Sequence, residues 1–337
     1  MSYTLVVVLW QALRLTAGDR FWWLGLANIF SFYLLVPLAL LVPLAGISIA
    51  WLALACQRWA VVAAIACSLS IILALYGGLS LPRSRRAGGP DETAPLGVLT
   101  LNVLGSNNDG APVERVIRAH SPDLIALQEL NPRLAADLQS RLGDDYPYHA
   151  LLPEEGVTGL GVFSRYPVND EGEIPDPAWK HGAQVMTVLF EGRSVLVLNV
   201  HALSSWTPFG SQSYTTKDFE KSFRLRELQV QLWLARIAEH DGPVIVAGDF
   251  NLTDQSAAYG QMAAQLQDAH RQAGWGLGHT FPAAALRMNW MPTPAQLLRL
   301  DYVWHSRHWT ATSSQVGEWD GRSDHRPYFA QVVLKTE

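Results

Sequence analysis

The segment Gly248-Asp249-Phe250-Asn251 carries a carboxylate and a carboxamide directly after the apolar run 243–247. A short β-branched run of this kind is typical of a buried strand, so Asp249 and Asn251 are expected to emerge together at its end. On its own, such a segment is most often a polar turn that closes a strand. Its significance therefore depends on which other polar residues the chain places at strand ends.

Other short apolar runs are also bordered by polar residues that can do chemistry. These are Asn102 after 98–101, Glu129 after 124–128, His201 after 195–200, Asp301 at the start of 301–304, and Ser323-Asp324-His325 shortly before 328–334. Carboxylate and carboxamide oxygens are ligands that Mg²⁺ and Mn²⁺ prefer. A histidine beside a carboxylate can take a proton from water near neutral pH. We therefore interpret these residues as one site assembled from several strand ends.

In order and spacing, these motifs resemble the endonuclease/exonuclease/phosphatase superfamily of metal-dependent phosphoesterases over residues 96–334. The motifs are Asn102, Gln128-Glu129, Asn199-Val200-His201, Gly248-Asp249-Phe250-Asn251, Asp301-Tyr302 and Ser323-Asp324-His325, with residues 161–167 between them. Each motif is weak alone, but six in the right order are not expected by chance. The resemblance implies an α/β protein in which two β-sheets pack together as an α/β sandwich with helices outside.

The resemblance also implies a role for each residue of the site. Glu129 would be the principal ligand of Mg²⁺ or Mn²⁺, and Asn102 would fix Glu129 or the water shell of the metal. Asp324 would be a second carboxylate near the metal. His325 would be the base that takes the proton of the attacking water, and Asp301 would hold it in the right tautomer. Together these residues would bind the cation and activate the water that phosphoester hydrolysis needs.

Three further roles follow from the same resemblance. Asp249 would orient the water, Asn251 would donate to a phosphoryl oxygen, and His201 would donate to the phosphate or the leaving group. In one respect the chain departs from the superfamily. Repair-type nucleases often carry an acidic residue two places after the first Asn, where this chain has Leu104. The site is therefore compatible with a single metal ion.

Periodicity and breaker residues predict the elements that position these groups. Pro132 suits the first position of a helix, and the run that starts at Phe223 has apolar residues at helical spacing. A glycine at position 192 fits the turn of a hairpin. The predicted elements are helices over 112–119, 132–142 and 223–239, and paired strands over 185–190 and 194–201.

The first quarter of the chain has a different composition. Of the 337 residues 49% are hydrophobic and 16% are charged, and the apolar excess is concentrated in two runs that flank Arg58. About 20 apolar residues cross a bilayer core as a helix, whereas a cleaved signal has one apolar region of about 7–15 residues. We therefore predict a transmembrane anchor over residues 1–81, a linker over 82–95 and a phosphoesterase domain over 96–337.

The number of membrane spans decides which side of the membrane the enzyme faces. The strongest predicted spans are 31–56 and 59–80, and 3–17 could be a first crossing. Three spans with Arg58 inside place the domain outside the cytoplasm, whereas two spans with the larger Arg count inside place it within. The layout resembles membrane-anchored bacterial members of the vancomycin/teicoplanin-resistance type. We therefore favour three spans in the bacterial inner membrane and an extracytoplasmic domain.

Charge narrows the substrate class. Residues 1–92 carry a net charge of +3 and the remaining chain carries −8, whereas enzymes of nucleic acids usually present a basic face to the backbone. The leading hypothesis is hydrolysis of a lipid or lipid-linked phosphate, such as a polyprenyl pyrophosphate, a phosphoinositide or a sphingomyelin-like lipid. The alternatives are a membrane-tethered nuclease and a catalytically silent ligand-binding membrane protein. No protein partner is inferred.

Two segments rich in aromatic side chains adjoin strand ends of the predicted site. Residues 202–223 follow His201, and residues 281–298 come shortly before Asp301. We predict that Trp206 and Trp290 contact substrate on a lipid-facing lip of the active site. The alternative is that the two segments pack on each other as a small core.

Overall fold

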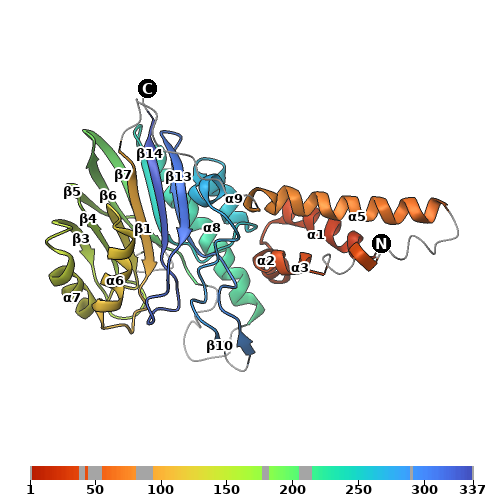
Figure 1. Cartoon of the computed structure of the whole chain (residues 1–337), viewed down its shortest axis with the longest axis horizontal. Coiled ribbons are helices and arrows are strands. Elements are labelled where there is room, and N and C mark those ends of the chain that lie inside the picture. The colour runs from red at the N-terminus through yellow and green to blue at the C-terminus, as the bar shows by residue number, and fades with distance from the viewer. Residues whose placement is uncertain are drawn as a thin grey trace.

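The computed structural model describes residues 2–37, 42–44, 55–80, 94–176, 182–204, 215–288 and 291–335. Within these residues, two six-stranded sheets form the body, and a group of N-terminal helices extends from one side of it (Figure 1). The α/β fold with two sheets that the sequence predicts is thus confirmed for the described part of the chain.

The first sheet contains the strands that precede Asn102 and Glu129. Its order is β13-β14-β1-β2-β4-β3. The central strand β1 runs parallel to β2 and antiparallel to β14. The bounds are β1 Leu96–Asn102, β2 Leu124–Gln128, β3 Tyr148–Leu152, β4 Leu160–Ser164, β13 Trp309–Val316 and β14 Tyr328–Leu334.

The second sheet contains the strands that carry His201, Asp249 and Asp301. Its order is β5-β6-β7-β8-β12-β9. Here β7 and β8 are parallel, and β12 is antiparallel to β8. The bounds are β5 Val168–Glu173, β6 Ala183–Phe190, β7 Arg193–His201, β8 Val244–Asp249, β9 Gln267–Asp268 and β12 Asp301–His305. A separate two-stranded sheet pairs β10 Leu286–Met288 with β11 Met291–Thr293.

Apolar side chains alternate between the two faces of each sheet, as the period of a strand requires. Val98 of β1 and Ile245 of β8 point into the core between the sheets. Leu99 of β1 packs outward under α6 Gly110–His120 and α7 Pro132–Leu142. The outer face of the second sheet is covered by α8 Thr216–Ala238 and α9 Ala257–Ala263. A short helix, α10 Ala269–Ala273, packs beside β13.

The structure contains most of the predicted helices and strands, and one helix begins earlier in the sequence than predicted. Helix α7 begins at Pro132 after the N-cap Asn131, whose side chain accepts the N–H of Leu134. Helix α8 begins at Thr216, well before the predicted start at 223, because Asp218 accepts hydrogen bonds from the backbone and the hydroxyl of Thr215. This local cap carries the helix into a stretch that the apolar spacing alone left as loop.

The N-terminal region is helical where the structure describes it. It contains α1 Ser2–Ala17, α2 Trp22–Ile29, α3 Ser31–Leu35 and α5 Ala55–Tyr76, followed by the 3₁₀ turn η1 Gly77–Leu79. The predicted span 59–80 thus falls on α5 and η1, and the predicted crossing 3–17 coincides with α1. In the predicted span 31–56, α3 ends at Leu35, and residues 38–41 and 45–54 lie outside the described part.

One helical segment among the described residues, Cys56–Leu79, is long and apolar enough to cross a membrane. It has 24 residues and a mean hydropathy of 2.3, and only 11% of its apolar window is buried within the molecule. Length and composition alone do not distinguish an anchor from other apolar helices. Helix α1 has 16 residues, fewer than a bilayer core requires of an untilted helix.

Candidate active site

Strand topology brings the polar strand ends together. In the parallel pairs, Asn102 is in register with Gln128, next to Glu129, and His201 is in register with Asp249. Because β12 runs antiparallel to β8, the first residue of β12, Asp301, lies opposite the last residue of β8. Ends of strands from both sheets thus meet at one edge of the sandwich, as the sequence predicts.

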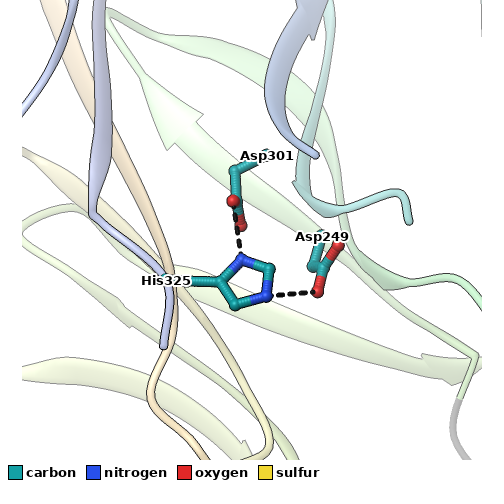
Figure 2. Close-up of side chains that lie close together, drawn as sticks. All are labelled: Asp249, Asp301 and His325. Atoms are coloured by element: carbon teal, nitrogen blue, oxygen red, sulfur yellow. Dashed lines mark hydrogen bonds and ion pairs between the residues drawn. The ribbon is translucent and has the colours of Figure 1, made fainter. Parts of the chain in front are cut away.

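His325 is held between two carboxylates (Figure 2). Its Nδ1 lies 2.8 Å from Asp301 Oδ2, and its Nε2 lies 3.5 Å from Asp249 Oδ2. All three side chains are buried. Burial alone would lower the pKa of His325, but Asp301 and Asp249 outweigh it and hold this pKa well above the ordinary value. Asp301 therefore fixes the ring orientation and stabilises its charged form, as a partner of a general base does.

Asp249 is the most perturbed carboxylate of this group. Burial raises its pKa to about 6, with a further contribution from the nearby Asp301, while His325 and His201 act in the opposite direction. The strand that carries it also needs the preceding glycine. A Cβ at Gly248 would lie 1.9 Å from the carbonyl oxygen of Val200 in β7. Glycine thus permits the close strand pairing that places Asp249 beside His201.

Glu129 faces the same space from the first sheet. Its Oε1 accepts a hydrogen bond from Asn102 Nδ2 at 3.0 Å, and its Oε2 accepts the N–H of Gly105 at 2.8 Å. Asn102 Nδ2 also lies 3.1 Å from Asp249 Oδ2, so one amide group joins the carboxylates of the two sheets. Burial raises the pKa of Glu129, and Asp324 raises it further. Asn102 thus orients Glu129, one of the two roles predicted for it.

His201 approaches the same two carboxylate oxygens that accept hydrogen bonds from Asn102. Its Nε2 is 3.8 Å from Asp249 Oδ2 and 4.0 Å from Glu129 Oε1. Burial lowers the pKa of His201, and the charge of Asp249 offsets this only in part. The two histidines therefore differ in charge preference: His325 is stabilised as the cation and His201 as the neutral ring. Such a division suits one proton acceptor and one neutral hydrogen-bond donor.

Asn251 borders the site, and the half-buried Asp324 lies near enough to Glu129 to raise the pKa of that carboxyl. Asn251 donates its backbone N–H to Asp249 Oδ1 at 2.9 Å and its side-chain amide to the carbonyl of Ala202 at 3.0 Å. Its φ is +48°, and that of Glu129 is +58°. A left-handed backbone costs a non-glycine residue about 1–3 kcal/mol and is found preferentially at functional sites. Glu129 follows β2 and Asn251 follows β8, and both have this left-handed backbone conformation.

The donors of the site fit a hard divalent cation, either at Glu129 and Asp324, as the family resemblance implies, or at a cluster of residues to which it gives other roles. The described residues include one cluster of the kind that could hold an ion, Asp249, Asp301 and His325, with one ligand atom from each within 4.8 Å of the others. Asp301 Oδ1 in this cluster is buried and has no hydrogen-bond partner among the described atoms. Glu129, which is half-buried, adds a carboxylate beside Asp249. Oxygen donors of this kind suit Mg²⁺ or Mn²⁺ rather than thiophilic metals.

Several supporting groups were not assigned roles from the sequence. Gln128 donates to Asn199 Oδ1 at 2.8 Å, and Asn199 donates to backbone carbonyls of the first sheet, so buried amides connect the sheets beneath the site. Ser323 donates to the carbonyl of Asn102 and accepts the N–H of His325. Gln128 and Asn199 could have been found from the sequence, because each is a polar residue in an otherwise apolar strand. Phe281, whose ring centroid lies 5.0 Å from that of His325, belongs to the aromatic segment 281–298 that the sequence predicts beside the site.

The predicted substrate contacts Trp206 and Trp290 lie outside the described residues. Several other apolar residues of the same two segments are described and pack together. Phe219 and Phe223 form a cluster with Phe281, Leu297 and Leu298, and residues of the N-terminal helices complete it. The small core that was the alternative to a lipid-facing lip therefore exists for these side chains, and it includes the N-terminal helices as well.

Comparison with known proteins identifies the family and supports the fold. The sequence profile of the Endonuclease/Exonuclease/phosphatase family matches residues 99–325. No curated protein matches the chain. Solved structures that resemble it include humanized D. rerio TDP2 with 14 mutations, at 21% identity and a TM-score of 0.54, covering 71% of this chain and 99% of that one.

Two further structures show the same fold. An endonuclease/exonuclease/phosphatase from Bacteroides vulgatus has 20% identity and a TM-score of 0.54, covering 72% of this chain and all of the other. The human Nocturnin catalytic domain has 19% identity and a TM-score of 0.52, covering 72% of this chain and 95% of that domain. Because the profile spans most of the chain, the protein belongs to the endonuclease/exonuclease/phosphatase family of hydrolases that act on phosphoester bonds.

Proposed function

We propose that the protein is a membrane-anchored, divalent-metal-dependent phosphoesterase that hydrolyses the phosphate ester or pyrophosphate of a lipid or lipid-linked substrate. The observation that carries this proposal is the position of the exposed apolar helices. They pack directly on segments that lead into the active site, so an amphiphile in the same membrane would be delivered close to the catalytic groups.

The surface of the N-terminal helices favours a bilayer as their environment. Helix α5 exposes Trp59 to 72% and Leu73 to 66%, and α1 exposes Leu5 to 68% and Leu15 to 69%. At about 1.5 Å per residue, the 22 residues of α5 match the roughly 30 Å hydrocarbon core. Contiguous apolar surface of this extent is rare on soluble monomers, whereas it is the normal exterior of a membrane segment.

The catalytic groups support hydrolysis by an activated water. His325, oriented by Asp301, would take the proton of the water, Asp249 would align that water, and His201 would donate a hydrogen bond toward the phosphate or the leaving group. A divalent cation, held by Glu129 with Asp324 nearby, would offset the negative charge of the phosphate. The raised pKa of Glu129 indicates a carboxylate whose ionisation gains from a cation.

The charge of the catalytic part favours a lipid over a nucleic acid. Beyond residue 92 the chain carries a net charge of −8. A polynucleotide backbone gains most of its affinity from lysine and arginine, which an acidic surface does not supply. A single phosphate group presented at a membrane needs no such extended basic face.

A substrate comparison tests the proposal. The purified full chain in nanodiscs with Mg²⁺ should hydrolyse a polyprenyl pyrophosphate, a phosphoinositide or sphingomyelin in the same disc at least about tenfold faster than single- or double-stranded DNA. Preferential DNA cleavage with binding that weakens steeply as salt rises would support the nuclease instead. Specific binding of one of these lipids without hydrolysis of any substrate would support the silent ligand-binding protein.

We further propose that the catalytic domain lies outside the cytoplasm, following three crossings. Arg58, predicted in a loop between two spans, lies in the first turn of α5 and would mark the inner end of that helix. A C-terminal fusion to alkaline phosphatase should then be active in a bacterial host, because this reporter folds only outside the cytoplasm. A matched fusion to a reporter that is fluorescent only in the cytoplasm should be dark. The reverse pattern would contradict three crossings and indicate two.

A further inference from the structure

A buried hydrogen-bond chain ties the N-terminal helices to the catalytic domain. Trp10 Nε1 donates to Asn28 Oδ1 at 3.0 Å, Asn28 Nδ2 donates to Asp19 Oδ1 at 2.7 Å, and Asp19 Oδ2 accepts the N–H of Ala257 at 2.8 Å. The side chains of Trp10, Asn28 and Asp19 are 6%, 0% and 5% exposed. Contacts this specific and this buried mark a fixed interface rather than a loose tether.

The series of hydrogen bonds ends at Ala257, in the segment that follows Asp249 in the sequence. Ala257 opens α9, and the residues between Asn251 and Ala257 connect the site to that helix. Arg14 adds a contact from α1 to the carbonyl of Gln255 in this segment at 3.5 Å. Asn251 itself holds Asp249 Oδ1 through its backbone N–H. A shift of α9 would therefore be transmitted through this segment to Asn251 and Asp249.

The N-terminal helices also hold the segment that precedes Asp301. Tyr33 donates its hydroxyl to the carbonyl of Leu297 at 2.7 Å. Ile29 packs in one apolar cluster with Leu300 and with Phe281, the residue whose ring contacts His325. The last turn of the N-terminal region is fixed as well, since Gly276 donates its N–H to the carbonyl of Leu79 at 2.9 Å.

We propose that the N-terminal helices are a positioning element of the catalytic centre, and that Asp19 is the positioning residue for the segment after Asp249. The helices contact the segments next to Asp249 and Asp301, and they pack in one cluster with Phe281, whose ring contacts His325. The packing of these helices against the catalytic domain then influences kcat, in addition to attaching the enzyme to the membrane. The inference goes beyond the proposed lipid substrate, because it concerns the hydrolysis of any phosphoester.

The test uses the full chain in nanodiscs and a soluble substrate, bis(p-nitrophenyl) phosphate. Asp19→Asn leaves one acceptor oxygen for two donors, so its NH₂ faces either the NH₂ of Asn28 or the N–H of Ala257 and breaks the chain of hydrogen bonds. We expect kcat per folded enzyme to fall about ten- to a hundredfold with little change in KM, because small misplacements of catalytic groups cost rates of this order. The double variant Asp19→Asn/Asn28→Asp exchanges the two groups and restores the donor–acceptor order from Trp10 to Ala257. It loses the hydrogen bond from Asn28 Nδ2 to the Gly18 carbonyl, so it should recover part of the rate.

Glu220→Gln provides the matched control. Glu220 Oε1 accepts the N–H of Trp22 at 3.2 Å, so it also joins the helices to the body, but through α8 rather than through a segment that carries a catalytic group. This variant should keep wild-type kcat. Tyr33→Phe, which removes a single hydroxyl, is a second probe that is expected to fold. It should lower kcat several-fold by releasing Leu297.

Amide hydrogen exchange supplies a readout that needs no substrate. Asp19→Asn should speed exchange over residues 251–257, and the double variant should return it toward the wild-type level. The proposal is overturned if Asp19→Asn lowers the melting temperature while leaving kcat per folded enzyme and this exchange unchanged. It is also overturned if Glu220→Gln lowers kcat as much as Asp19→Asn does, or if Asp19→Asn misfolds and Tyr33→Phe keeps full activity.

Discussion

Glu129→Gln should lower kcat/KM by about three orders of magnitude while leaving the fold intact. The change removes a charge from a buried site where Asn102 and Gly105 hold the carboxylate in place. Without that charge the cation is bound weakly, and the repulsion between the water nucleophile and an anionic phosphate is no longer offset. Glutamine is isosteric, so the fold should be kept. Its NH₂ replaces one of the two oxygens that accept hydrogen bonds from Asn102 and Gly105, so the melting temperature should fall by a few degrees.

Steady-state kinetics at saturating Mg²⁺, together with a thermal melt, checks this expectation. Glu114→Gln is a matched control, since Glu114 forms ion pairs with arginines on the surface of the helical layer and takes no part in the site. Excess EDTA should abolish wild-type activity, and added Mg²⁺ or Mn²⁺ should restore it. Full activity of the wild type in EDTA, or of Glu129→Gln in Mg²⁺, would exclude the role assigned to Glu129.

His325→Ala and Asp301→Asn should behave as one unit. Each alone is expected to lower kcat by about two to four orders of magnitude, the usual range for a general base. Because Asp301 acts through the 2.8 Å contact with His325 Nδ1, the double variant should lose far less than the product of the single losses. Multiplicative losses would show that the two residues act independently.

The pH profile of Asp301→Asn gives a separate check on the same pair. Asp301 raises the pKa of His325, so its neutralisation should lower that pKa. A base must be neutral to accept a proton. The acidic limb of the kcat profile should therefore move to lower pH in Asp301→Asn, and an unmoved limb would mean that another group titrates there.

The sequence located most of the site because polar residues stand out at the ends of apolar strands. Asp249, Asp301 and His325 were predicted from such positions, and the register of β8 and β12 brings the first two together. Strand ends can be read locally, since the apolar run and its polar end are adjacent in the chain. The two-sheet fold followed from a family pattern that extends over most of the same residues.

Two features were not predicted in this way, one local and one long-range. The start of α8 depended on a cap between Thr215 and Asp218, which the apolar spacing does not record. The hydrogen bond from Ala257 to Asp19 joins residues that are 238 positions apart. In the sequence, Asp19 is an isolated acidic residue that follows the apolar run 3–17. Nothing in its local pattern indicates a buried contact with the active-site segment, because that contact arises from tertiary packing.

Mn²⁺ binding tests most directly the proposal that Glu129 is the principal ligand of the divalent cation. Titration of the full chain, followed by the loss of the free Mn²⁺ resonance in electron paramagnetic resonance, should show one strong site in the wild type. Glu129→Gln should weaken that site at least about a hundredfold, whereas His325→Ala should leave it nearly unchanged. The contrary result, unaltered binding by Glu129→Gln and loss of binding in His325→Ala, would place the ion among Asp249, Asp301 and His325 and would contradict the roles proposed for them.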